Sequence, residues 1–161
     1  MSFCKKIVLG FLIHCFIITT ASGTQFPRGC EVKGFAYQDN DLILNEHGQQ
    51  SFYLIKNHSN LLIELEHYET KNVFMSPKLH TKLDPAMSAA FASDVPLLYF
   101  KCYTQEGDHP TIVPCKDVLD ICQYPRVKFA LSNMGNYWVS TNKDQAQVIK
   151  DASIKGIWLH W

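Results

Sequence analysis

Short runs of alternating apolar and polar residues, separated by turn residues, fill the chain from residue 31 onward. Alternation is clearest in Leu61 to His67, where one face would carry Leu61, Ile63 and Leu65 and the other Leu62, Glu64 and Glu66. A period of two is typical of a strand with one buried and one solvated face. The pattern predicts a mainly β chain that forms a small antiparallel β-sandwich or barrel-like domain, not βαβ units.

Two strands and a polar connection predict a hairpin at the centre of the domain. Phe52 to Lys56 and Leu61 to His67 are separated by the four polar residues 57–60, which suit a hairpin loop. The most apolar segment of the domain is Leu97 to Tyr103, which we expect to be a central strand.

A second hairpin and one short helix are expected near the C-terminus. Residues 126–131 and 137–140 flank 132–136, whose Asn and Gly residues tolerate positive φ and favour a turn. After Thr141 the period becomes helical, and a stripe of residues three apart predicts a helix over 143–152 with Asn142 as its cap: Ala146, Ile149 and Ala152. Residues 157–159 would form a last strand.

The N-terminus has the pattern of a secretory signal peptide. Lys5 and Lys6 precede an apolar run over 7–18, and the small residues Ala21 and Gly23 suit cleavage after Gly23, or after Ala21. An uncleaved membrane anchor is the alternative, but the run is shorter than the roughly 20 residues that span a bilayer. We therefore expect a signal peptide over 1–23 and a single exported β-rich domain over 24–161, periplasmic or secreted, with no stable membrane span after cleavage.

Charge limits the partners of that domain. The whole chain has 15 basic and 15 acidic residues, and loss of Lys5 and Lys6 leaves a net charge of −2. Such a balance gives no broad basic surface, so nucleic acid is not expected as a partner.

Four cysteines would remain after cleavage: Cys30, Cys102, Cys115 and Cys122. An even number in an exported chain predicts two disulfides, and the three possible connectivities stay open. Pairing among the last three is attractive, because 102–115 could be a hairpin and 115–122 closes a short loop. No pair has the spacing of a zinc knuckle, so no metal site is expected.

No motif for phosphate binding, nucleophilic catalysis or metalloprotease chemistry occurs, so we expect no cofactor and assign no catalytic residue. Glu64, Glu66 and Glu69 are interpreted as the wet face of a strand. The most polar loop, 104–110, is the candidate recognition loop, through Glu106, Asp108 and His109.

Four aromatic residues flank the expected helix: Tyr137, Trp138, Trp158 and Trp161. They could form a stacking platform for a sugar or peptide, but rings that anchor the helix to the sheet are the favoured interpretation. Asn57-His58-Ser59 is a formal N-glycosylation sequon, relevant only in a eukaryotic source.

Several ordered segments together resemble the enhanced-entry protein B family of Legionella-type intracellular bacteria. They are residues 52–59, Asp84 to Ala89, Tyr99 to Cys102, Cys115 to Cys122 and Gly135 to Val139. The chain departs from that family at Ala90-Phe91, where the family has a Gly-Trp pair. The resemblance implies a small exported envelope protein linked to host-cell entry, with no established catalytic mechanism and no catalytic residues to carry over.

Two hypotheses of function follow. The first is a noncatalytic exported module that binds an envelope or host protein or glycan through loops such as 104–110. The alternative is a small cell-wall or protein hydrolase, or an inhibitor of one, with Glu106, Asp108 and His109 as the residues to substitute first.

Overall fold

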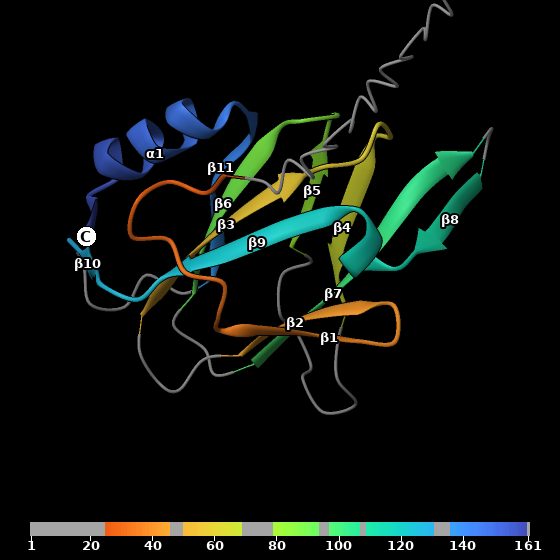
Figure 1. The fold of residues 1–161 in the computed structure, drawn as a ribbon, viewed down its shortest axis with the longest axis horizontal. Helices are drawn as coiled ribbons and strands as arrows, with labels where there is room; N and C mark the ends of the chain where they lie inside the picture. Colours follow the sequence, from red (N-terminus) through yellow and green to blue (C-terminus); the bar gives the residue numbers. More distant parts are fainter. Residues whose placement is uncertain are drawn as a thin grey trace, which may run out of the picture.

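A computed structural model describes residues 25–45, 50–68, 79–93, 97–106, 109–130 and 136–160 of the chain (Figure 1). Several sequence-based expectations fall outside these ranges: the signal peptide over 1–23, Glu69, Asp108 and Trp161. Within the described ranges, no helix has the length and apolar character needed to cross a membrane.

The larger of the two main sheets has six antiparallel strands in the spatial order β1-β2-β7-β4-β5, with β8 also paired to β7. Its strands are β1 (Phe35–Gln38), β2 (Asp41–Asn45), β4 (Ile63–His67), β5 (His80–Leu83), β7 (Leu97–Glu106) and β8 (His109–Val113). The expectation of a central strand at 97–103 is confirmed, since β7 pairs with β2, β4 and β8.

The second sheet has four antiparallel strands in the order β11-β6-β3-β9. These are β3 (Ser51–Asn57), β6 (Ser88–Ser93), β9 (Leu119–Tyr124) and β11 (Tyr137–Lys143). A short ribbon joins β10 (Val127–Phe129) to β12 (Ile157–Leu159), the 3₁₀ turn η1 spans Cys115–Asp117, and α1 spans Gln145–Ile154. The expected mainly β, antiparallel domain with one C-terminal helix is confirmed.

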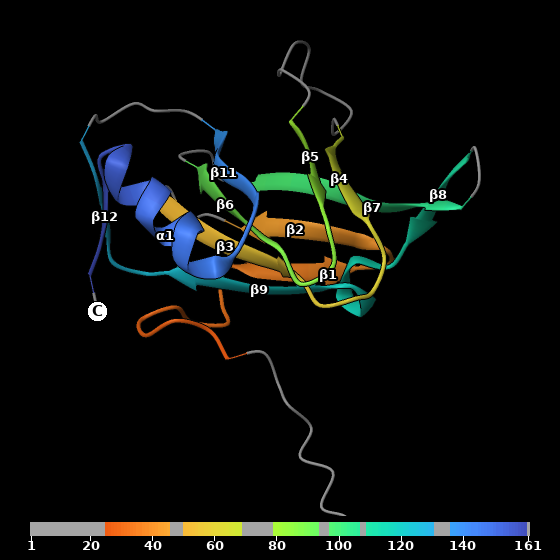
Figure 2. The ribbon, with the colours of Figure 1, turned by 90° about the horizontal axis from the view of Figure 1, so that it is seen from above.

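The four-stranded sheet is the middle of three layers (Figure 2). One of its faces packs on the six-stranded sheet through residues such as Tyr53, Phe91 and Phe100. Its other face packs on α1 and the β10–β12 ribbon through Leu54, Val148 and others. Because both faces are covered, β3 and β6 are buried almost throughout and show no alternation of apolar and polar residues.

The expectation of a hairpin between residues 52–56 and 61–67 is wrong. β3 pairs with β6 and β9, whereas β4 pairs with β5 and β7 in the other sheet, so the connection crosses between the sheets. The fully buried side chain of Asn57 holds this crossing. Its Nδ2 donates to the carbonyls of Leu61 (2.7 Å) and Leu83 (3.0 Å), and its Oδ1 accepts from Ser59 N (2.9 Å) and Ser59 Oγ (2.7 Å).

The same hydrogen bonds determine whether the predicted sequon at Asn57 is accessible for glycosylation. Both Nδ2 hydrogens of Asn57 are engaged and the residue exposes no surface, so the folded domain does not present this asparagine for glycosylation.

The expected hairpin around residues 132–136 is also wrong. β10 pairs with β12, and β11 pairs with β6. Phe129 and Ile157 meet in the core beneath α1, so burial of these two side chains selects the partner of β10. Turn residues indicate that a chain changes direction, but they do not indicate which strand becomes its neighbour.

The helix lies close to its expected place but with a different cap and face. Asp144, not Asn142, is the N-cap, and its side chain accepts a hydrogen bond of 2.9 Å from Gln147 N. Asn142 instead has a φ of 52° and bonds Asp84. Val148 and Ala152 are the buried helix residues, and Ala146 of the expected stripe is exposed.

Candidate functional site

The β7–β8 hairpin forms an arm that extends beyond the sheets (Figures 1 and 2). β2 pairs with the first half of β7, up to Phe100, and β8 pairs with the second half, from Cys102 to Glu106. β4 occupies the other edge of β7 only as far as Thr104. The end of the arm therefore has neighbours only within the hairpin itself, among the described strands.

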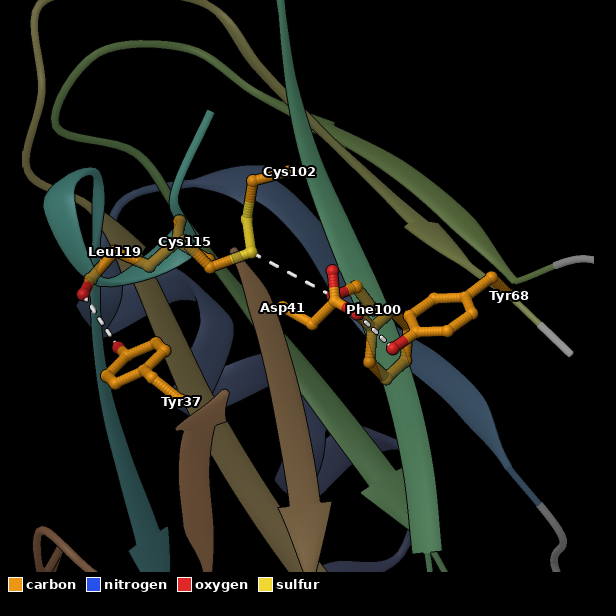
Figure 3. The surroundings of a disulfide bond; sticks show 7 residues. All are labelled: Tyr37, Asp41, Tyr68, Phe100, Cys102, Cys115 and Leu119. Carbon is orange, nitrogen blue, oxygen red and sulfur yellow. Dashed lines mark hydrogen bonds between the residues drawn. A yellow bond between two sulfur atoms is a disulfide. The ribbon is translucent and has the colours of Figure 1, made fainter. Parts of the chain in front are cut away.

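A buried disulfide closes the base of this arm (Figure 3). Cys102 and Cys115 are bonded and have no exposed surface. Cys115 N donates to the carbonyl of Asn40 (3.0 Å), which ties the base to the β1–β2 turn, and Cys115 Sγ lies 3.9 Å from the carbonyl oxygen of Phe100. A disulfide sulfur has no proton to donate, so the last contact is packing.

Tyr37 adds a further tie beside this disulfide (Figure 3). Its hydroxyl donates to the carbonyl of Leu119 (3.0 Å) and so joins β1 to β9. Burial, and then the charge of Asp120, raise the pKa of Tyr37 to about 12.

The second disulfide joins Cys30 to Cys122, so the expectation of two disulfides is confirmed and the connectivity is resolved. Of the two pairings that the sequence favours, Cys102 pairs with Cys115, whereas Cys115 does not pair with Cys122. β9 directs Cys122 to the helix-side core and away from Cys115, which lies in the core between the sheets.

The outer strand of the arm exposes its side chains. His109, Pro110, Thr111 and Ile112 are all exposed, and Ile112 retains 48% of its surface. Ile112 lies directly opposite Tyr103, and Pro110 lies opposite Gln105. Directly opposed residues point to the same face of a sheet, and so do residues two apart on one strand. The face with Ile112 therefore also contains Tyr103 and Pro110. We call these three residues the arm face.

Pro110 determines how the arm could contact another chain. Proline has no backbone N–H, so this strand lacks one of the donors that an added strand would need. Proline on an edge strand is a common protection against strand addition. Contact through side chains, above all the exposed Ile112, is therefore favoured over backbone pairing.

Two of the three residues expected in the recognition loop are paired at the end of the arm. Glu106 lies opposite His109 in the β7–β8 register, and His109 is exposed. Asp108 lies outside the described residues.

The aromatic residues near the helix do not share a surface. Tyr137 packs in the helix-side core, whereas Trp138 packs in the core between the sheets, with ring centroids 4.9 Å from Phe91 and 5.9 Å from Phe100. Trp158 is 45% exposed and lies opposite Lys128 on the β10–β12 ribbon. Neighbours on a strand point to opposite faces, which separates Tyr137 from Trp138.

A pocket of about 510 Å³ opens where the edge strands β5 and β11 meet α1. Residues from all three elements line it: His80, Thr81, Trp138, Val139, Ser140, Thr141, Lys143, Asp151 and Lys155. No local pattern in the sequence indicates this site, because His80 and Lys155 are 75 positions apart. β11 has two register shifts within this stretch, and such bulges redirect side chains at sheet edges.

Asp151 is the acidic centre of the pocket wall. Ser140 Oγ donates to its Oδ2 (2.6 Å), Gln147 Nε2 donates to its Oδ1 (2.7 Å), and Lys143 Nζ lies 3.4 Å from its Oδ2. The hydrogen bonds from Ser140 and Gln147, followed by the interaction with Lys143, hold the pKa of Asp151 below its usual value. Asp151 is therefore ionised at neutral pH, with both oxygens already engaged.

His80, at the other side of the pocket, contacts Glu64 on the neighbouring strand, and Lys82 Nζ lies 3.3 Å from Glu64 Oε2. Burial alone would raise the pKa of Glu64, but His80 and Lys82 together hold it below its usual value. Among the described residues, no group of three or more His, Cys, Asp and Glu side chains is placed to hold a metal ion.

Comparisons with known proteins add no relative: no protein-family model, curated protein or solved structure matches this chain. The resemblance to the enhanced-entry protein B family stays a prediction from the segments that carry it.

Proposed function

We propose that this protein is an exported, noncatalytic binding module that recognises another protein through the arm face. The exposed Ile112 of β8, close to the buried disulfide that closes the base of the hairpin, carries this proposal. A partner gains most from contacting a surface that is already ordered, because little conformational entropy is lost on binding. The resemblance described above adds a cellular setting, the envelope of a bacterium that enters host cells.

Export is supported by the two disulfides. Disulfides persist in oxidising compartments such as the periplasm or the exterior of the cell, and are rare in the cytosol. Together with the signal pattern over 1–23, they favour a mature protein that begins near residue 24.

Mass spectrometry of the protein secreted by its native host tests export. The expected mass lacks residues 1–23, and none of the four remaining cysteines reacts with an alkylating reagent until the protein is reduced. A protein that retains its first residues, with its cysteines alkylated in the native state, would contradict export.

Site-specific photo-cross-linking tests recognition through the arm. A photoreactive amino acid at position 112 is expected to trap a partner, whereas the same group at the exposed Ile154 of α1 traps none. The trapped protein is then purified and its affinity is measured. Ile112→Ser removes most of one buried aliphatic side chain from the interface and should weaken binding roughly tenfold.

The matched variant Ile154→Ser removes the same side chain from a surface outside the arm, and the affinity should not change. Equal affinities for the wild type and Ile112→Ser, or identical adducts from positions 112 and 154, would refute recognition through the arm face.

A further inference from the structure

The pocket between β5, β11 and α1 is separate from the arm. Figures 1 and 2 both place α1 and β8 at opposite ends of the domain. A function of this pocket is therefore independent of the protein contact proposed for the arm face, and the two can fail separately.

Asp151, the one carboxylate among the described residues that line the pocket, already has partners for both of its oxygens. Asp151 already accepts from Ser140 and Gln147 and contacts Lys143, so each of its oxygens has at least one partner. These contacts come from β11 and from α1 itself, which makes Asp151 part of the wall that joins the helix to the sheet. The contact with Asp151 also positions the ammonium group of Lys143 in the pocket lining.

Hydrogen-bond donors remain in excess in the pocket. Lys143 and Lys155 have three N–H groups each. Lys143 contacts Asp151, and Lys155 donates to the carbonyl of Val139. The indole Nε1 of Trp138 is buried and has no acceptor among the described residues. This atom has no accessible surface, so it does not itself contact a ligand in the pocket, but its N–H signal reports on changes in the pocket wall.

The charges of the lining residues also favour an anionic ligand. Lys143 and Lys155 carry two positive charges and Asp151 one negative charge, while His80 is directed to Glu64 outside the lining. The volume of about 510 Å³ is within the range of small-molecule sites and exceeds what a bare inorganic ion would fill.

From this geometry we propose that the pocket binds a small ligand that carries an anionic oxygen group, a carboxylate or a phosphate. Lys143 at the end of β11 and Lys155 at the C-cap of α1 bind the anionic group from two different parts of the chain. The remaining volume accepts the polar body of the ligand, of the size of a sugar, against Thr81 and Thr141. Charge-assisted hydrogen bonds of this kind are about twice as strong as neutral ones.

The indole N–H signals in a ¹H–¹⁵N NMR spectrum test this proposal. Purified protein with its disulfides intact is titrated at constant ionic strength with inorganic phosphate in one series and with glucuronate in another. The Trp138 signal is expected to shift and saturate, whereas the signal of Trp158, which does not line the pocket, stays in place. The chain has three tryptophans, Trp138, Trp158 and Trp161, so the Trp158→Phe and Trp161→Phe variants together identify the three indole peaks. The anion that saturates at lower concentration identifies the preferred group.

Two pocket variants and one control complete the test. Lys143→Gln and Lys155→Gln each remove one charged donor and should weaken binding by roughly tenfold. Lys116→Gln, on the exposed surface of η1, changes the net charge equally and should not alter the affinity. Far-UV circular dichroism confirms that each variant folds.

Saturable shifts that depend on both pocket lysines support the proposal. Shifts that grow linearly with either anion, that occur equally at Trp158, or that Lys116→Gln reduces as much as the pocket variants would overturn it.

Discussion

Replacing Asn57 by alanine should cost about 4 kcal/mol of unfolding free energy. The alanine variant loses four hydrogen bonds, two that Asn57 donates and two that it accepts. The bond to the carbonyl of Leu83 is fully buried, and its loss leaves an unsatisfied acceptor worth about 2 kcal/mol. The other three bonds are partly exposed and contribute roughly 0.5 to 1 kcal/mol each.

Urea unfolding of the disulfide-bonded protein measures this effect. For a slope near 2 kcal/mol per molar urea, a loss of about 4 kcal/mol lowers the midpoint by about 2 M with the slope unchanged. Such a loss is a large part of the 5 to 15 kcal/mol that stabilises an ordinary domain.

Two further variants separate hydrogen bonding from shape. Asn57→Asp keeps the size of the side chain but directs a carboxylate oxygen at the two carbonyls, so it should destabilise at least as much as alanine. Ser59→Ala removes only contacts at the edge of the network and should cost about 1 kcal/mol. If alanine costs less than about 1 kcal/mol, or if aspartate equals the wild type, the buried amide does not hold the crossing.

Three other outcomes are expected. Alanine at both Cys30 and Cys122 removes a bridge across 92 residues, and chain entropy predicts a loss of about 4.6 kcal/mol in chemical unfolding; a loss below about 2 kcal/mol would contradict this. Gly156→Ala should cost at least about 1 kcal/mol in thermal unfolding, because φ is +74° and the new Cβ would lie 2.8 Å from the Cβ of Ala130. Gly156→Asn brings the same Cβ contact but tolerates positive φ better, so it should cost less than alanine. Burial raises the pKa of Tyr37 and Tyr124 to about 12, so their ultraviolet titration should begin well above pH 10. The unfolded chain then loses these protons first, and stability should fall between pH 10 and 12; a normal tyrosine titration would refute the assignment.

Local features of the sequence predicted most of the strands and the helix. β7 was evident because an apolar run of that length in a β-rich chain needs neighbours on both edges. The alternation in β4 placed Ile63 and Leu65 in the core and left Glu64 half-exposed. These properties depend on residues next to one another, so one chain segment is enough to show them.

Local sequence did not predict which strands pair with one another. Asparagine is common in turns, yet the buried amide of Asn57 joins the two sheets. The local sequence around it is compatible with either role. β10 likewise reaches its partner β12 only after the chain has passed through β11 and α1. The competing arrangements differ in burial and hydrogen bonding between distant segments, which no local pattern contains.

The candidate sites show the same difference between what the sequence predicts and what depends on the packing of distant segments. Four cysteines behind a signal-peptide pattern were enough to predict two bridges, because that inference needs only their number and the expected compartment. Which cysteines pair, and the joining of Lys143, Asp151 and Lys155 into one pocket with His80, depend on how β5, β11 and α1 pack. Residue order encodes the elements and their buried faces, whereas the contacts that could bind a ligand exist only once the layers are assembled.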